Sequence, residues 1–262
     1  MTQDERRMYL IQKLLNERKE YSNIKIPDDI DAKKILLRSL MNVRMAMDTD
    51  DELLAVQDEY LREEIVNKGI VTIQNMDEVL DDIYIWRGDI TRIKADAIVN
   101  AANSGMTGCY VPNHNCIDNC IHTYAGMELR NYCADMMRRQ GHEEATGEAK
   151  ITPAYNLPCN YIIHTVGPIV QGRLKSEHEE LLKKCYESCL LLAQDNHINS
   201  IAFCCISTGV FGFPNERASK IAVNTVMEYK RITNSKMKVI FNVFKEEDEE
   251  LYRREFERQI TR

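Results

Sequence analysis

The sequence lacks any apolar run long enough to span a membrane, and no apolar segment follows its charged first residues. It also lacks a surplus of positive charge, because 34 Lys and Arg stand against 41 Asp and Glu and leave a formal net charge of −7. General nucleic-acid binding needs such a surplus for phosphate contacts. We therefore expect a cytoplasmic protein that binds neither membranes nor nucleic acids in general, and that holds any anionic ligand with local donors.

The cysteines do not suit a disulfide framework. Their number, nine, is odd, and the chain shows no export signal. Free thiols or metal ligation are the expected uses. With 44% apolar and 29% charged residues, no internal repeat and no low-complexity linker, the chain has the composition of a globular protein.

Residues 1–75 have apolar side chains at helical spacing only. Helices are expected at about 2–18, 28–43 and 50–68, with two acidic residues favouring the start of the second. This part contains no catalytic pattern. We interpret it as a helical cap packed on the main domain; a surface for partner docking or substrate gating is the alternative.

From about residue 70 onward, apolar runs of strand length alternate with helical patterns, which is typical of a layered α/β domain. The central runs are continuously apolar, as expected for strands covered on both faces. Strands are expected at 70–73, 83–86, 97–100, 149–153, 161–166, 200–205 and 238–243. Helices are expected at about 115–140, 176–197, 215–231 and 247–258.

The densest chemistry lies between residues 88 and 126. Asp89 follows an expected strand, where its carboxylate can accept from an exocyclic amine beside the backbone N–H of Ile90. Asn100 and Asn103 end the next strand, and their amides can hold sugar hydroxyls without adding charge. Asp89 could instead cap the turn. The two amides could instead form hydrogen bonds to backbone groups of the loop. We expect the acid, the amides and the neighbouring metal-type ligands to face one cleft.

A second ligand-type segment follows the expected strand at 200–205. Its glycines let a ligand approach the backbone, and consecutive N–H groups before a helix form an anion site suited to a diphosphate. A tight turn that needs glycine for its conformation is the alternative. The residues are Ser207, Thr208, Gly209, Val210, Phe211 and Gly212.

Three soft or borderline metal ligands occur within eight residues, in the pattern Cys109-x4-His114-x-Cys116. Zinc favours thiolate and imidazole ligands, and catalytic sites keep three protein ligands with an open fourth position. Cys120 lies one helical turn after Cys116, so a closed site with three cysteines is an alternative. Free thiols near an incidental histidine are the second alternative.

Five short motifs together resemble the macrodomain, the ADP-ribose-binding α/β/α fold. The resemblance covers about residues 70–262. It implies a three-layer α/β/α macrodomain with a central mixed sheet at 76–262, preceded by an all-helical N-terminal extension at 1–75. The motifs are Gly88-Asp89-Ile90-Thr91, Val99-Asn100-Ala101-Ala102-Asn103, Ile121-His122 before Ala125-Gly126, His164-Thr165-Val166-Gly167-Pro168 and Ser207-Thr208-Gly209-Val210-Phe211-Gly212-Phe213-Pro214.

The segment at 112–119 departs from the common pattern. Hydrolytic macrodomains carry a glycine-rich segment before Val-Asp-Gly, whereas this chain has Pro-Asn-His-Asn-Cys-Ile-Asp-Asn. With the helical extension, this resembles the zinc-containing macrodomains of microbial pathogens, which remove mono-ADP-ribose from proteins. The resemblance implies one Zn²⁺ per chain, held by Cys109, His114 and Cys116 and accessible to the ligand.

The same resemblance implies roles for the other site residues. Asp118 matches an acid proposed to orient or activate water at the anomeric carbon, with Asn119 and Asn103 beside it, and a carboxylate near that carbon is chemically suited to the task. Helix capping is the alternative for Asp118. Asp89 and Ile90 would contact adenine.

The amides of Asn100 and Asn103 can hold the hydroxyls of the distal ribose. Phe244, just past the last strand, is placed to stack on adenine, with core packing as the alternative. His122 and His164 lie in apolar settings and are interpreted as core or supporting histidines.

The predicted function is therefore that of a zinc-dependent hydrolase, which removes mono-ADP-ribose from modified protein side chains and releases ADP-ribose. The expected partners are ADP-ribose and the modified protein. A binding module that recognises ADP-ribose without turnover is one alternative, and an O-acetyl-ADP-ribose deacetylase is another. The coincidence of Asp118 with a metal-type loop favours the hydrolase, because a binding module needs neither.

Overall fold

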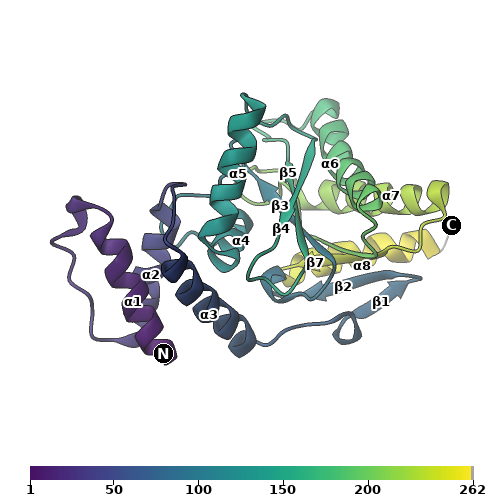
Figure 1. Cartoon of the computed structure of the whole chain (residues 1–262). Coiled ribbons are helices and arrows are strands. Elements are labelled where there is room, and N and C mark those ends of the chain that lie inside the picture. Colours follow the sequence, from purple (N-terminus) through teal and green to yellow (C-terminus); the bar gives the residue numbers. More distant parts are fainter. Residues whose placement is uncertain (261–262) are drawn as a thin grey trace.

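The computed structural model describes residues 1–260, and its first three helices form a bundle of their own (Figure 1). Thr2 starts the first helix with a capping box, and Asp29 and Asp50 cap the other two by accepting backbone N–H bonds. Their apolar stripes meet in a small core that also includes Met127 of the main domain. The helices are α1 (Gln3–Asn16), the short 3-10 helix η1 (Lys19–Tyr21), α2 (Ile30–Val43) and α3 (Asp51–Lys68).

A seven-stranded mixed sheet forms the centre of the remaining chain, in the order β1-β2-β7-β6-β3-β5-β4. The inner strands β2, β7, β6, β3 and β5 are parallel, and β1 and β4 pair antiparallel at the two edges. Most residues of the inner strands are buried, as their continuous apolar runs predict. The strands are β1 (Asp77–Leu80), β2 (Ile83–Arg87), β3 (Ala97–Ala102), β4 (Ala149–Pro153), β5 (Tyr161–Val166), β6 (Ser200–Phe203) and β7 (Lys238–Val243).

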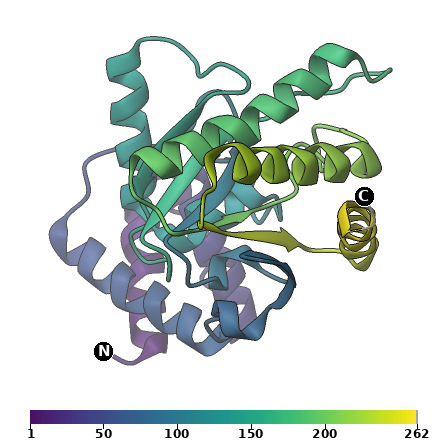
Figure 2. The same ribbon diagram turned by 90° about the vertical axis from the view of Figure 1, so that its right-hand side faces the viewer.

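Helices cover both faces of the sheet, which gives the predicted three-layer α/β/α architecture (Figures 1 and 2). Two helices, α4 and α5, form one layer, and α1–α3 lie outside them. The other three, α6, α7 and α8, pack side by side on the opposite face. Their bounds are α4 (Ile117–Ala125), α5 (Met127–Gln140), α6 (Ser176–Asp195), α7 (Asn215–Thr233) and α8 (Glu246–Ile260), with short 3-10 helices η2 (Ile73–Asn75) and η3 (Ile90–Arg92).

Two sequence-based expectations about these elements were wrong. The predicted strand at 70–73 is an isolated bridge between Val71 and Ile93, because Thr72 and Asn75 bond to each other and start the turn η2. The sheet begins instead with β1. The single helix predicted at 115–140 is two helices, because Gly126 adopts a φ of 106° and its N–H bonds to the end of α4.

The parallel strands fix where ligand-type residues gather. Strands β2, β7, β6 and β3 are neighbours, so the loops that follow them leave the same edge of the sheet. In open α/β sheets, ligands bind at this carboxyl edge. Within residues 1–260, no helix has both the length and the apolar character needed to cross a membrane.

Candidate active site and metal centre

Asp89 follows β2 and is held by a turn and by a helix of the N-terminal bundle. Its Oδ1 accepts from the backbone N–H and the hydroxyl of Thr91, at 3.0 and 2.6 Å, and its Oδ2 accepts from Lys68 Nζ of α3 at 3.2 Å. Burial alone would raise the pKa of this carboxyl, but the Thr91 bonds and the Lys68 charge outweigh it and hold the pKa below its usual value. Asp89 is therefore an ionised acceptor beside the backbone of Ile90.

The segment 207–212 follows β6 and has the backbone expected of an anion loop. Ser207 and Gly212 both have positive φ, and the turn is closed by the bond from Phe213 N–H to the Ser207 carbonyl at 3.0 Å. Among the described residues, the N–H groups at 209–211 have no backbone acceptor, and helix α7 begins shortly after them. Gly167 lies against this turn, since a Cβ there would come within 2.1 Å of Ser207 Oγ. Free N–H groups before a helix suit a diphosphate.

Asp118 lies in the first turn of α4 and points back to β3. Asn100 Nδ2 donates to its Oδ1 at 2.8 Å, and Asn103 Nδ2 donates to its Oδ2 at 3.0 Å. Asp118 does not cap the helix, because Cys116 is the N-cap and accepts from the Asn119 N–H at 3.4 Å. Burial raises the pKa of Asp118 to about 6, against the opposing effects of the two amides and of a nearby arginine charge.

Two buried histidines lie next to Asn100 and Asp118. His164 Nδ1 lies 3.1 Å from Asn100 Nδ2, and its Nε2 lies 3.0 Å from the Thr152 hydroxyl. Burial lowers the pKa of His164 to about 3, so the ring is neutral and its Nδ1 can accept from the amide. His122 Nε2 lies 3.6 Å from Asp118 Oδ1, and burial lowers the pKa of His122 well below its usual value. Both histidines are buried, as predicted.

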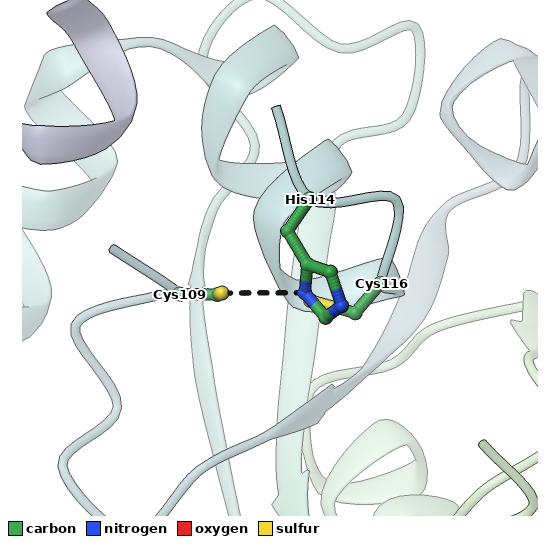
Figure 3. Close-up of side chains that lie close together, drawn as sticks. All are labelled: Cys109, His114 and Cys116. Atoms are coloured by element: carbon green, nitrogen blue, oxygen red, sulfur yellow. Dashed lines mark hydrogen bonds between the residues drawn. The ribbon is translucent and has the colours of Figure 1, made fainter. Parts of the chain in front are cut away.

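The three predicted metal ligands come together on the loop between β3 and α4 (Figure 3). Their ligand atoms all lie within 4.8 Å of one another, and Cys109 Sγ lies 3.5 Å from His114 Nδ1. Zinc bonds of about 2.3 Å to sulfur and about 2.1 Å to nitrogen place these atoms about 3.5 Å apart in a tetrahedral site. Cys120 is not a member of the group, and its Sγ lies 3.6 Å from Arg38. The donor set fits an open three-ligand zinc site.

The thiol of Cys116 is perturbed by its surroundings. Burial raises its pKa to about 12, and the nearby Cys109 and Asp118 add to that effect, although a bond from the Asn119 N–H opposes it. A zinc ligand must be a thiolate, so zinc binding at Cys116 would have to displace a proton.

Asn119 was predicted to act beside Asp118, but its side chain bonds to the backbone of the loop before α4. It is fully buried, and its Nδ2 donates to the carbonyls of Cys109 and Val111 at 3.2 and 3.0 Å. Its amide thus holds the loop at 109–116, which contains the three candidate ligands and is called the metal loop, against α4. Phe244, by contrast, is 76% exposed just past β7, which rules out core packing and leaves its ring free for a ligand.

The comparisons with known proteins agree with this geometry. A family model described as Macro domain matches residues 99–222. A protein-ADP-ribose hydrolase of Treponema medium is 58% identical over 256 residues, which make up 96% of this chain and 98% of that protein. The chain belongs to the macrodomain family. It is a macrodomain enzyme of the protein-ADP-ribose hydrolase group.

Two further relatives of this macrodomain cover most of its length. A protein-ADP-ribose hydrolase of Staphylococcus aureus strain MRSA252 is 49% identical over 253 residues, which make up 95% of this chain and 94% of that protein. The crystal structure of the Trypanosoma brucei macrodomain in complex with ADP-ribose is 28% identical, with a TM-score of 0.64, and the match covers 87% of this chain and 96% of that chain. The similarity to these relatives extends over most of the helical extension.

Residues of the extension reach the macrodomain site, and sequence patterns did not predict them. Lys68 of α3 bonds to Asp89, and Arg38 of α2 donates to Asn119 Oδ1 at 3.0 Å. Asn42, on the apolar face of α2, is only 1% exposed. A buried asparagine in an apolar stripe must find a polar partner, and this was the one sequence feature that could have indicated a contact.

Proposed function

We propose that this macrodomain is a zinc-dependent hydrolase that removes mono-ADP-ribose from modified protein side chains. The observation that carries the proposal is the position of Asp118, whose two carboxylate oxygens are held by Asn100 and Asn103 beside a cluster of three metal-type ligands. A module that only binds ADP-ribose needs neither a fixed buried acid nor a metal.

The ligand is proposed to lie along the carboxyl edge of β2, β7, β6 and β3. Asp89 and Ile90 would read adenine at one end, with the exposed ring of Phe244 available for stacking. The N–H groups of the 207–212 loop would hold the diphosphate. Asn100 and Asn103 would contact the distal ribose, which places its anomeric carbon towards Asp118.

Cys109, His114 and Cys116 would hold one zinc ion per chain. A zinc ion with an open coordination position polarises oxygen atoms of a bound ligand or water. This part of the proposal rests on the types of the three donors and on the 3.5 Å between Cys109 Sγ and His114 Nδ1.

The reaction is a hydrolysis at the anomeric carbon. The bond from that carbon to the modified side chain breaks, a water oxygen bonds in its place, and the departing side chain takes up a proton. Asp118 is proposed to orient the water and accept its proton, since a carboxylate fixed by two amides cannot rotate away. Asn119 acts on the reaction through the loop that it holds.

The test combines substrate turnover with metal analysis. The purified protein should release ADP-ribose from a mono-ADP-ribosylated protein, and it should contain about one zinc per chain. ADP-ribose binding without any release would favour a binding module. Release by a zinc-free protein at the full rate would retain the hydrolase and exclude the zinc dependence, and turnover of O-acetyl-ADP-ribose alone would favour a deacetylase.

A further inference from the structure

Helix α2 of the extension lies against the metal loop, and Arg38 makes more hydrogen bonds to this region than any other side chain of α2. Its Nη2 donates to the His114 carbonyl at 2.8 Å and to Asn119 Oδ1 at 3.0 Å, and its Nη1 donates to Asn115 Oδ1 at 3.3 Å. The guanidinium group therefore bridges a predicted metal ligand, its neighbour and the first turn of α4. The planar fork of arginine holds its donors in fixed directions, which suits contacts with several acceptors at once.

Two other side chains of α2 fix the residue before His114. Asn42 Oδ1 accepts from the Asn113 N–H at 2.9 Å, and Ser39 Oγ accepts from Asn113 Nδ2 at 2.6 Å. Asn113 has a φ of 54°, which is a left-handed conformation that asparagine tolerates at some cost. Asn42 also donates to the Thr123 hydroxyl of α4 at 2.9 Å, so the same amide ties the loop to the helix that follows it.

One donor of Arg38 is not used. Its Nε is buried and, within the described residues, has no hydrogen-bond partner. An unsatisfied buried donor destabilises a fold.

We propose that α2 is a positioning element for the metal loop, and that Arg38 sets how firmly the loop holds its metal. This inference rests on the proposed zinc site. The loop at 109–116 contains no helix or strand, so its ligands have no regular structure to hold them at their spacing. Helix α2 supplies that support from outside the loop, and the extension is thereby part of the active site rather than a separate docking domain.

The experiment compares zinc release from four full-length proteins loaded with zinc. These are the wild type, Arg38→Ala, Ser39→Ala and the control Arg44→Ala. Arg44 is also a buried arginine at the end of α2, but its side chain bonds to Glu17 and to the carbonyl of Asp48, both within the extension. The rate is measured as transfer of zinc to a chromophoric chelator, and thermal unfolding of each protein is measured alongside.

Arg38→Ala should release zinc about tenfold faster than the wild type, because it removes three hydrogen bonds that each have a modest net effect. Ser39→Ala removes one bond to the loop, from Asn113, and one bond within α2, to the Ile35 carbonyl, without leaving a large cavity. It should therefore fold and give a smaller acceleration. Arg44→Ala should release zinc at the wild-type rate even where its Tm falls further. The visible spectrum of cobalt-loaded protein, which reports ligand geometry, should change in Arg38→Ala and not in Arg44→Ala.

Three results would overturn the inference in distinguishable ways. A wild type that binds no zinc removes the proposed metal site and this inference with it. Zinc bound to the wild type but released at one common rate by all four proteins removes only the role of α2. Equal acceleration in Arg38→Ala and Arg44→Ala would assign the effect to general loss of stability in the extension.

Discussion

Asn100 donates a side-chain N–H to Asp118 Oδ1 at 2.8 Å, and this bond joins β3 to α4 at the centre of the site. Since Asn103 donates to the other oxygen at 3.0 Å, the carboxylate is fixed at both ends. A carboxylate accepts at both oxygens, whereas an amide at the same position accepts at only one and presents a donor at the other. The two donors around position 118 therefore favour a carboxylate over an amide.

This relationship predicts the effects of Asp118→Asn. We expect the variant to retain ADP-ribose binding and zinc and to lose about 10²–10⁴-fold in hydrolysis, the range for removing a general base. Because one of the two asparagines must then face a donor, the free energy of unfolding should also fall by about 1–3 kcal/mol. Calorimetry, single-turnover rates and urea unfolding measure the three effects.

Asp96→Asn is a matched control for that variant. Asp96 also accepts hydrogen bonds at both oxygens, but it precedes β3 and so lies at the opposite edge of the sheet, where it binds the backbone of Asn199 and Ser200. It should lose stability and keep its hydrolysis rate. Hydrolysis near the wild-type rate in Asp118→Asn would instead favour attack assisted by the substrate.

The layers and the ligand edge could be predicted from sequence because they depend on local patterns. Apolar runs marked each inner strand, and the neighbouring parallel strands brought the residues after them to one edge. The strand predicted at 70–73 does not form, because short polar side chains compete with the sheet for backbone groups. Thr72 and Asn75 bond to each other there, which composition alone does not reveal.

The contacts of the extension could not be predicted for a different reason. Arg38 and Asn119 are 81 residues apart, and Lys68 and Asp89 belong to different layers of the fold. Helical spacing shows which face of α2 is buried but not what it packs against. The three candidate metal ligands could be grouped from the sequence because their types and spacing are local to one loop.

A second prediction concerns adenine recognition. Asp89→Ala should weaken ADP-ribose binding by about 1–3 kcal/mol, the usual cost of losing a charge-assisted hydrogen bond. Asp81→Ala, an exposed acid in the turn before β2, should bind as tightly as the wild type. Titration calorimetry with ADP-ribose measures both. Unchanged affinity in a folded Asp89→Ala protein would reduce Asp89 to a turn residue that bonds to Thr91.

A third prediction concerns metal content. Replacing Cys109, His114 or Cys116 by alanine should deplete zinc, because each removes one of only three protein ligands. Cys120→Ala should retain about one zinc per chain, since its thiol lies beside Arg38 and outside the ligand group. Elemental analysis of the purified proteins decides between them. Depletion in Cys120→Ala with retention in Cys109→Ala would reverse the ligand assignment.

The last prediction concerns the pH dependence of stability, and it follows from the burial of His164. Its pKa in the folded protein is about 3, below the value of about 6.5 in an unfolded chain. The unfolded state therefore takes up a proton that the folded state does not, so the stability due to neutral His164 is present above pH 6.5 and is lost as the pH falls towards 3. The groups that face it are His122 and Cys133, with Asp118 beyond Asn100.

Between pH 7 and pH 5, this proton alone should cost the wild type about 2 kcal/mol of unfolding free energy. His164→Gln keeps a polar side chain and cannot take up the proton, so it should start less stable at pH 7 and lose about 2 kcal/mol less over the same interval. Urea unfolding of both proteins at the two pH values, without added metal, gives the difference. Equal losses in the two proteins would mean that the folded protein takes up this proton over the same pH interval as the unfolded chain, which would make Nδ1 a donor at pH 5 and set it against the Asn100 amide that positions Asp118.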